Sequence, residues 1–99
     1  SEEIRQYAVS EAIKILEADI SNMTKNLISW ALRRICEYTE LQENVPNRLC
    51  DLLTQVNYEI QVQVITTLLK CVSKMKHCPE NIIECVAKCY QLSSRDVKQ

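Results

Sequence analysis

The sequence predicts an all-α protein of about five to six helices, paired in antiparallel fashion into an α-solenoid segment. Its 99 residues contain no glycine and two prolines, so tight β-hairpin turns lack their usual residues. Apolar residues recur at helical spacing through most of the chain. Short polar links of the length found between antiparallel helices separate these stretches. A closed bundle of five helices is the alternative, and a short last helix favours the solenoid.

The longest pattern, over residues 57–75, predicts the central helix, with Asn57 as its N-cap. The inner stripe is predicted to comprise Ile60, Val64, Leu68, Cys71, Val72 and Met75. The predicted solvent face comprises Glu59, Gln63, Thr66, Thr67, Lys70, Ser73 and Lys74. Val62, Ile65 and Leu69 widen the apolar side. A helix with so wide an apolar side is expected to contact neighbours on two sides.

Two helices are expected before this one. The first covers residues 3–16, and its inner face is predicted to be Ile4, Ala8, Ala12, Ile15 and Leu16. Tyr7, Val9 and Ile13 lie beyond that stripe, so we expect this end to expose apolar surface. The second helix begins at an N-cap, Ser21 or Asn22, and continues to about Thr39. Its predicted inner face is Leu27, Ile28, Ala31, Leu32, Ile35 and Cys36.

The remaining helices flank the central one. A short helix over residues 46–55 begins with a proline suited to the first turn and is predicted to bury Leu49, Leu52, Leu53 and Val56. Pro79 opens the fifth helix, which carries Ile82, Ile83, Val86, Ala87, Cys89 and Tyr90. Ser93 or Ser94 is expected to cap a sixth helix over residues 95–99.

Charge and hydropathy exclude several classes of protein. With 12 basic and 13 acidic residues the formal charge is −1, which argues against a nucleic-acid binder. The sequence has neither an apolar run of about 18 residues, as a membrane span needs, nor a basic-then-apolar leader. Because the chain starts with Ser1 rather than Met, we expect a single helical-repeat segment, residues 1–99, excised from a longer trunk.

The six cysteines favour a reducing, cytosolic compartment over a disulfide scaffold, because five of them fall within helical patterns rich in aliphatic residues. The alternative is zinc, for which the candidate ligands are Cys71, His77, Cys78, Cys85 and Cys89. Their spacing matches no standard zinc finger. We therefore expect neither a metal nor another cofactor.

Catalysis is not expected. The chain has a single histidine, no glycine-rich loop and no phosphate-cradling motif, and Glu2–Glu3 and Glu40–Glu43 are interpreted as solvated surface. Arg33–Arg34 and the group of Lys70, Lys74 and Lys76 are interpreted first as solvated faces. The alternative is contact with acidic partners or anionic lipid head groups.

Several segments resemble the trunk of the large adaptin subunits of clathrin-associated adaptor complexes. Residues 6–9 and 13–16 are similar to a helix of that trunk, and Trp30 with Glu37-Tyr38 is similar to its Trp-x-x-Gly-Glu-Tyr motif at a wider spacing. Residues 48–53 match in place and pattern. Residues 67–72 are similar to the Ala-Ile-x-Lys-Leu helix, and residues 81–99 to the run leading into a Gln-Arg-Ala helix.

This resemblance implies a HEAT- or armadillo-like trunk that acts as a structural scaffold in vesicle coat assembly and intracellular protein transport. It implies protein partners, namely other subunits of a coat or adaptor complex, and a cytoplasmic location peripheral to Golgi or endosomal membranes. Membrane contact would be made only through the parent complex, and no catalytic, cofactor-binding or metal residues are implied. The alternatives are an independent armadillo- or HEAT-like protein-interaction module in another pathway and, third, a redox- or zinc-dependent regulator.

Overall fold

The computed structural model describes residues 1–42 and 44–98, and the surroundings of side chains as far as Cys89. Within these residues the chain forms five α-helices and no β-strand, which confirms the predicted all-α class. The helices are α1 (Glu2–Glu17), α2 (Asn22–Ile35), α3 (Val45–Leu52), α4 (Tyr58–Ser73) and α5 (Glu80–Lys98).

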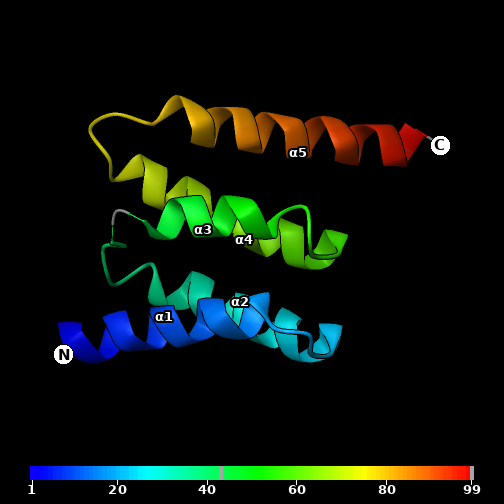
Figure 1. Cartoon of the computed structure of the whole chain (residues 1–99). Coiled ribbons are helices and arrows are strands. Elements are labelled where there is room, and N and C mark those ends of the chain that lie inside the picture. The colour runs from blue at the N-terminus through cyan, green and yellow to red at the C-terminus, as the bar shows by residue number, and fades with distance from the viewer. Residues whose placement is uncertain (43, 99) are drawn as a thin grey trace.

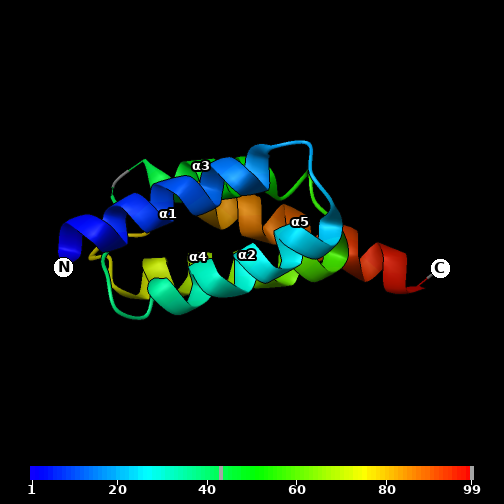
Figure 2. The same cartoon turned by 90° about the horizontal axis from the view of Figure 1, so that it is seen from below.

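The helices form two layers. α1 and α3 lie in one layer and α2 and α4 in the other, as Figure 2 shows. Antiparallel pairs α1–α2 and α3–α4 stack on each other, and α5 packs on α3 at one end of the stack (Figure 1). The extents of 46 × 34 × 17 Å fit a slab two helices thick, because packed helix axes lie about 8–10 Å apart. This is the arrangement of an α-solenoid.

Local sequence explains most of the helix boundaries. The Ser21 hydroxyl accepts the Thr24 N–H at 3.3 Å, and the Asn57 side chain accepts the Ile60 N–H at 3.0 Å. These contacts confirm the N-cap positions predicted for the second and central helices. The second helix ends earlier than expected, at Ile35, and a turn follows it.

The buried faces of α1 and α2 differ from the predicted ones. α1 buries Val9, Ala12, Ile13 and Leu16, whereas Ile4 is 69% exposed. The expectation that Val9 and Ile13 expose apolar surface was therefore wrong, and of that group Tyr7 is exposed. α2 buries Ser29, Leu32 and Cys36 at its C-cap, whereas Leu27 is 66% exposed. Ala12, Leu16, Leu32 and Cys36 are buried as predicted, whereas the placement of Ile4 and Leu27 was wrong. Both helices carry aliphatic residues on more than one side, and only the neighbouring helix selects which side is covered.

The buried side of the central helix α4 is rotated about the helix axis relative to the predicted one. Ile60, Val64, Leu68 and Cys71 are buried as predicted. Gln63 and Thr67, assigned to solvent, are buried because α2 packs on that side. The Thr67 hydroxyl donates to the Gln63 carbonyl at 2.9 Å, so its burial leaves no unsatisfied donor. Leu69, expected on the apolar side, is 54% exposed.

The last two predicted helices are one. α5 runs without interruption from Glu80 to Lys98, so Ser93 and Ser94 lie inside a helix and not at the start of one. An N-cap residue has non-helical backbone dihedral angles, and the backbone continues helically at both serines. Ile82 and Cys89 are buried as expected, whereas the Tyr90 side chain lies outside the described residues.

Among the described residues, the structure contains no helix that combines the length and the apolar character needed to cross a bilayer.

Candidate interaction face

The outer surface of the second layer carries a row of exposed apolar and aromatic side chains along α2. Met23, Leu27 and Trp30 are 77%, 66% and 50% exposed, and Arg34 follows on the same stripe. Their spacing of four, three and four residues places them on one side of a helix. This side lies opposite the buried Ser29 and Leu32, and the described part of the chain leaves it exposed.

A second stripe lies on α4, which packs beside α2 in the same layer (Figure 2). Tyr58, Val62 and Leu69 are exposed and follow positions 23, 27 and 34 at a constant interval of 35 residues. The two helices therefore repeat one pattern of exposure. We name the combined surface the α2–α4 face, defined by Met23, Leu27, Trp30, Arg34, Glu37, Tyr38, Tyr58, Val62, Leu69 and Lys70.

Polar side chains join the two stripes. Arg33 donates to the Gln63 side-chain oxygen at 2.9 Å, and its guanidinium lies 4.9 Å from the centre of the Trp30 ring. This cation–π contact holds the indole in place while leaving half of it exposed. A preoriented, half-exposed tryptophan beside an arginine is typical of residues that dominate binding energy at protein interfaces.

Glu37 lies between two cations at the C-terminal end of the face. Its carboxylate contacts the Arg34 guanidinium at 3.1 Å and accepts a hydrogen bond from the Lys70 ammonium. The hydrogen bond from Lys70, together with the neighbouring positive charges, lowers the pKa of Glu37. The carboxylate therefore stays ionised, and the arginine and lysine are held apart at a fixed spacing on either side of it.

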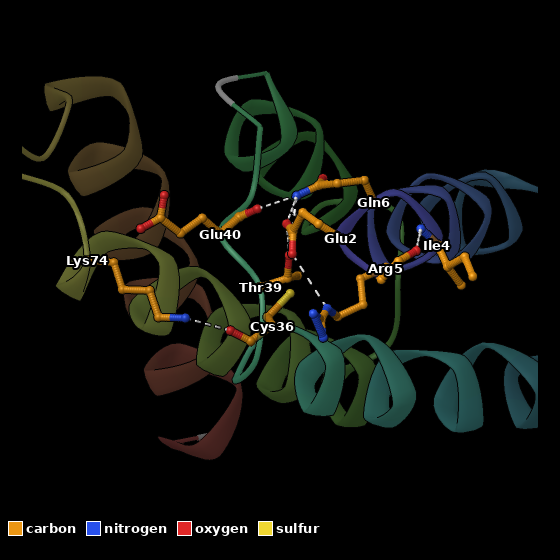
Figure 3. Close-up of polar contacts among 9 residues, drawn as sticks. Glu2, Ile4, Arg5, Gln6, Cys36, Thr39, Glu40 and Lys74 are labelled. Atoms are coloured by element: carbon orange, nitrogen blue, oxygen red, sulfur yellow. Dashed lines mark hydrogen bonds and ion pairs between the residues drawn. The ribbon is translucent and has the colours of Figure 1, made fainter.

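The segment that carries Glu37 and Tyr38 is anchored at both ends (Figure 3). At one end the Lys74 ammonium donates to the Cys36 carbonyl at 2.9 Å. At the other end the buried Thr39 hydroxyl donates to the Glu2 carboxylate, which lowers the pKa of Glu2. Gln6 donates to the same carboxylate at 2.9 Å and to the Glu40 carbonyl at 2.6 Å. Glu2, interpreted from sequence as free surface, is thus part of a junction that ties α1 to the chain after α2.

A cleft of about 720 Å³ opens between α3 and α5. Its lining residues are Asn47, Cys50, Asp51, Leu53, Thr54, Gln61, Asn81, Cys85, Lys88 and Cys89. Asn81 donates to the Asn47 side-chain oxygen at 2.7 Å and joins the two helices, and the Cys85 thiol contacts the Cys50 carbonyl at 3.6 Å. Burial and the neighbouring Cys85 thiol raise the pKa of Cys50 to about 12, so this thiol is protonated at neutral pH.

Another pair of thiols, Cys36 and Cys71, lies between α2 and α4. Both line a small cavity of about 80 Å³ beside Lys74. A hydrogen bond from the Cys71 thiol, with the charges of Lys74 and Lys70, lowers the pKa of Cys36, while its role as donor and its burial raise the pKa of Cys71. All six cysteines are free.

The residues singled out in the sequence are only partly brought together. Cys71 pairs with Cys36, far from the cleft that holds Cys85 and Cys89, and the described residues form no group of three or more potential metal ligands. Arg33, Arg34 and Lys70, by contrast, meet at the α2–α4 face. Sequence reasoning missed the face itself because Leu27 was assigned to an inner face and Leu69 to the apolar side of the central helix, although the 35-residue interval between the two stripes was visible in the sequence.

Comparisons of the chain with models of protein families, with curated proteins and with solved structures gave no match.

Proposed function

We propose that this chain is a non-catalytic scaffold that binds other proteins through the α2–α4 face. The observation that carries the proposal is the face itself, which combines Trp30, two tyrosines, Arg34 and exposed apolar residues on two adjacent helices and the turn after α2. Aromatic residues, Met and Arg are the types enriched at protein interfaces. Stacked helix pairs supply the rigid, extended surface that such binding uses.

The resemblance to adaptin trunks extends this proposal to the class of partner. On that basis the partners are other subunits of an adaptor-type complex in vesicle coat assembly and intracellular protein transport. The chain would act in the cytoplasm, peripheral to Golgi or endosomal membranes. Two stacked helix pairs followed by α5 are what a segment of such a trunk requires, which supports the proposal at the level of architecture.

Site-specific photo-crosslinking in cells tests both levels. A photo-crosslinking amino acid replaces Leu27 on the face or, as the matched control, the similarly exposed Ile4 on α1. We expect position 27 to give a discrete set of crosslinked proteins that position 4 does not give, and mass spectrometry to identify coat or adaptor subunits among them. Identical patterns from both positions would contradict a role for the face. Specific partners from unrelated pathways would retain the scaffold role and remove the adaptor assignment.

A further inference from the structure

The charges around the α2–α4 face are strongly one-sided. α2 carries Arg33 and Arg34 in its last turn and has no acidic residue. The last turn of the parallel helix α4 adds Lys70, its C-cap is Lys74, and Lys76 follows in the next segment. This concentration is local, because the whole chain has a net charge of −1 and α1, on the other layer, contains four glutamates against two basic residues.

Internal pairing leaves part of this positive charge available. Glu37 is the carboxylate that contacts Arg34 and Lys70, so one negative charge serves two cations. Arg33 is bonded to the neutral Gln63 and stacks on Trp30, so its charge is not neutralised by either contact. α4 has one acidic residue, Glu59, which lies in its first turn, away from the basic end.

The apolar part of the face has the form of a helix-binding strip. Positions 23 to 34 of α2 extend over about 16 Å at 1.5 Å per residue, which corresponds to three turns of a helix. The α4 stripe runs parallel to it, and the contacts Arg33–Gln63 and Lys70–Glu37 lie along the line between the two helices. Two parallel apolar ridges with polar groups between them suit a partner helix that presents apolar residues every three to four positions.

We propose that the α2–α4 face binds an acidic amphipathic helix of a protein partner. This inference rests on the proposed function and adds the chemistry of the partner. The apolar stripe of that helix packs on Met23, Leu27 and Trp30, and its carboxylates meet the cations near the C-terminal ends of α2 and α4. Opposite charges raise the association rate and select the orientation, while the apolar contacts provide most of the affinity.

Two other occupants fit the face less well. A second copy of the chain in a two-fold dimer would place this basic surface against a copy of itself. An anionic membrane would attract the cations, but its negative charge is spread over the whole surface and would also face Glu37, which lies among them. A helix can place its carboxylates opposite the cations alone.

Peptide binding to the whole chain provides the test. The probe is a synthetic amphipathic helix with leucine on one face and glutamate on the other, and its control carries lysine at every glutamate position. Trp30 is the only tryptophan, so its emission reports on the face directly. We expect the acidic helix to shift this emission to the blue and to bind at least about tenfold more tightly than the basic helix, with affinity falling as salt is added.

Matched variants locate the interaction. Arg34→Glu is compared with Lys14→Glu, since both side chains are mostly exposed and each pairs with one glutamate three residues away. Leu27→Gln is compared with Ile4→Gln on α1. We expect Arg34→Glu and Leu27→Gln each to weaken binding by about tenfold, and the two α1 variants to leave it unchanged, with helical circular dichroism retained in all four.

Each alternative result overturns the inference. Equal affinity for the two helices would remove the role of charge. Binding to phosphatidylserine vesicles without binding of the acidic helix would assign the face to a membrane, and sedimentation showing a dimer broken by Leu27→Gln would assign it to a second copy. If photo-crosslinking at position 27 captures a partner that lacks an acidic helix, the proposed function survives and the chemistry proposed for the partner does not.

Discussion

Replacing Leu68 and Leu69 in turn by alanine tests the rotation of α4 within the fold. The two leucines are adjacent in sequence, but Leu68 is fully buried in the hydrophobic core, whereas Leu69 is 54% exposed on the α2–α4 face. Truncating a fully buried leucine costs about 2–5 kcal/mol, from lost transfer energy and the cavity that remains. Leu69 keeps about half of its surface in water, so Leu69→Ala should cost about 1 kcal/mol or less.

Thermal unfolding followed by circular dichroism separates these values. For a domain of this size, 1 kcal/mol corresponds to about 4–8 °C in Tm, so a loss of about 2 kcal/mol or more in Leu68→Ala should lower Tm by at least about 8 °C. Leu69→Ala should lower it by a few degrees. Urea titration of the same variants gives the free energies of unfolding directly. Equal losses, or a larger loss for Leu69→Ala, would refute the placement of α4, because one residue corresponds to a rotation of about 100°.

Three further predictions concern ionisation and metal. In a carbon-detected NMR titration the Glu2 carboxyl should titrate below its ordinary pKa of 4.5, and Thr39→Val should move it upward by removing the hydroxyl donor; an unchanged titration would contradict the junction. The raised pKa of Cys50, about 12, means that its neutral form stabilises the fold below the unfolded thiol's pKa of about 8.5, and that this contribution is lost as pH rises from there toward 12. Urea titrations at pH 8 and 10 should show that the free energy of unfolding falls less steeply with pH in Cys50→Ala than in the unsubstituted protein. The two slopes should differ by less than about 1.4 kcal/mol per pH unit, because the thiol is partly exposed. A chelator should leave Tm unchanged, because the described residues form no group of three or more potential ligands, and a large loss of helicity would restore the zinc alternative.

The junction between α1 and the 36–41 segment determines how the end of the face is presented. Thr39 is buried although its neighbours are exposed, and its hydroxyl, with Gln6, engages a glutamate in the first turn of α1. Because Glu2 lies near the positive end of the α1 dipole, its ionised form is favoured there as well. Loosening this junction would release Glu37 and Tyr38 before it affected the core, so the face depends on contacts made at its back.

The helical class and most boundaries follow from the sequence alone. Helical spacing of apolar residues, the absence of glycine and capping residues such as Ser21 and Asn57 act within a few positions of chain, and these local effects predicted α1 to α4 correctly in order and type. The leucines at 49, 52 and 53 were correctly placed in the core because α3 has a single apolar side.

Only the tertiary structure decided which side of the wider helices is covered. Leu27 and Leu69 are as apolar as Leu32 and Leu68, so the spacing of apolar residues does not show which of them are buried. A helix with aliphatic residues over more than half of its circumference has several possible inner faces. The choice is made by neighbours distant in sequence, such as α2 covering Gln63 and Thr67. The α2–α4 face consists of the sides of α2 and α4 that no neighbouring helix covers. The sequence determines which residues it contains, and the packing of the helices determines that they are exposed.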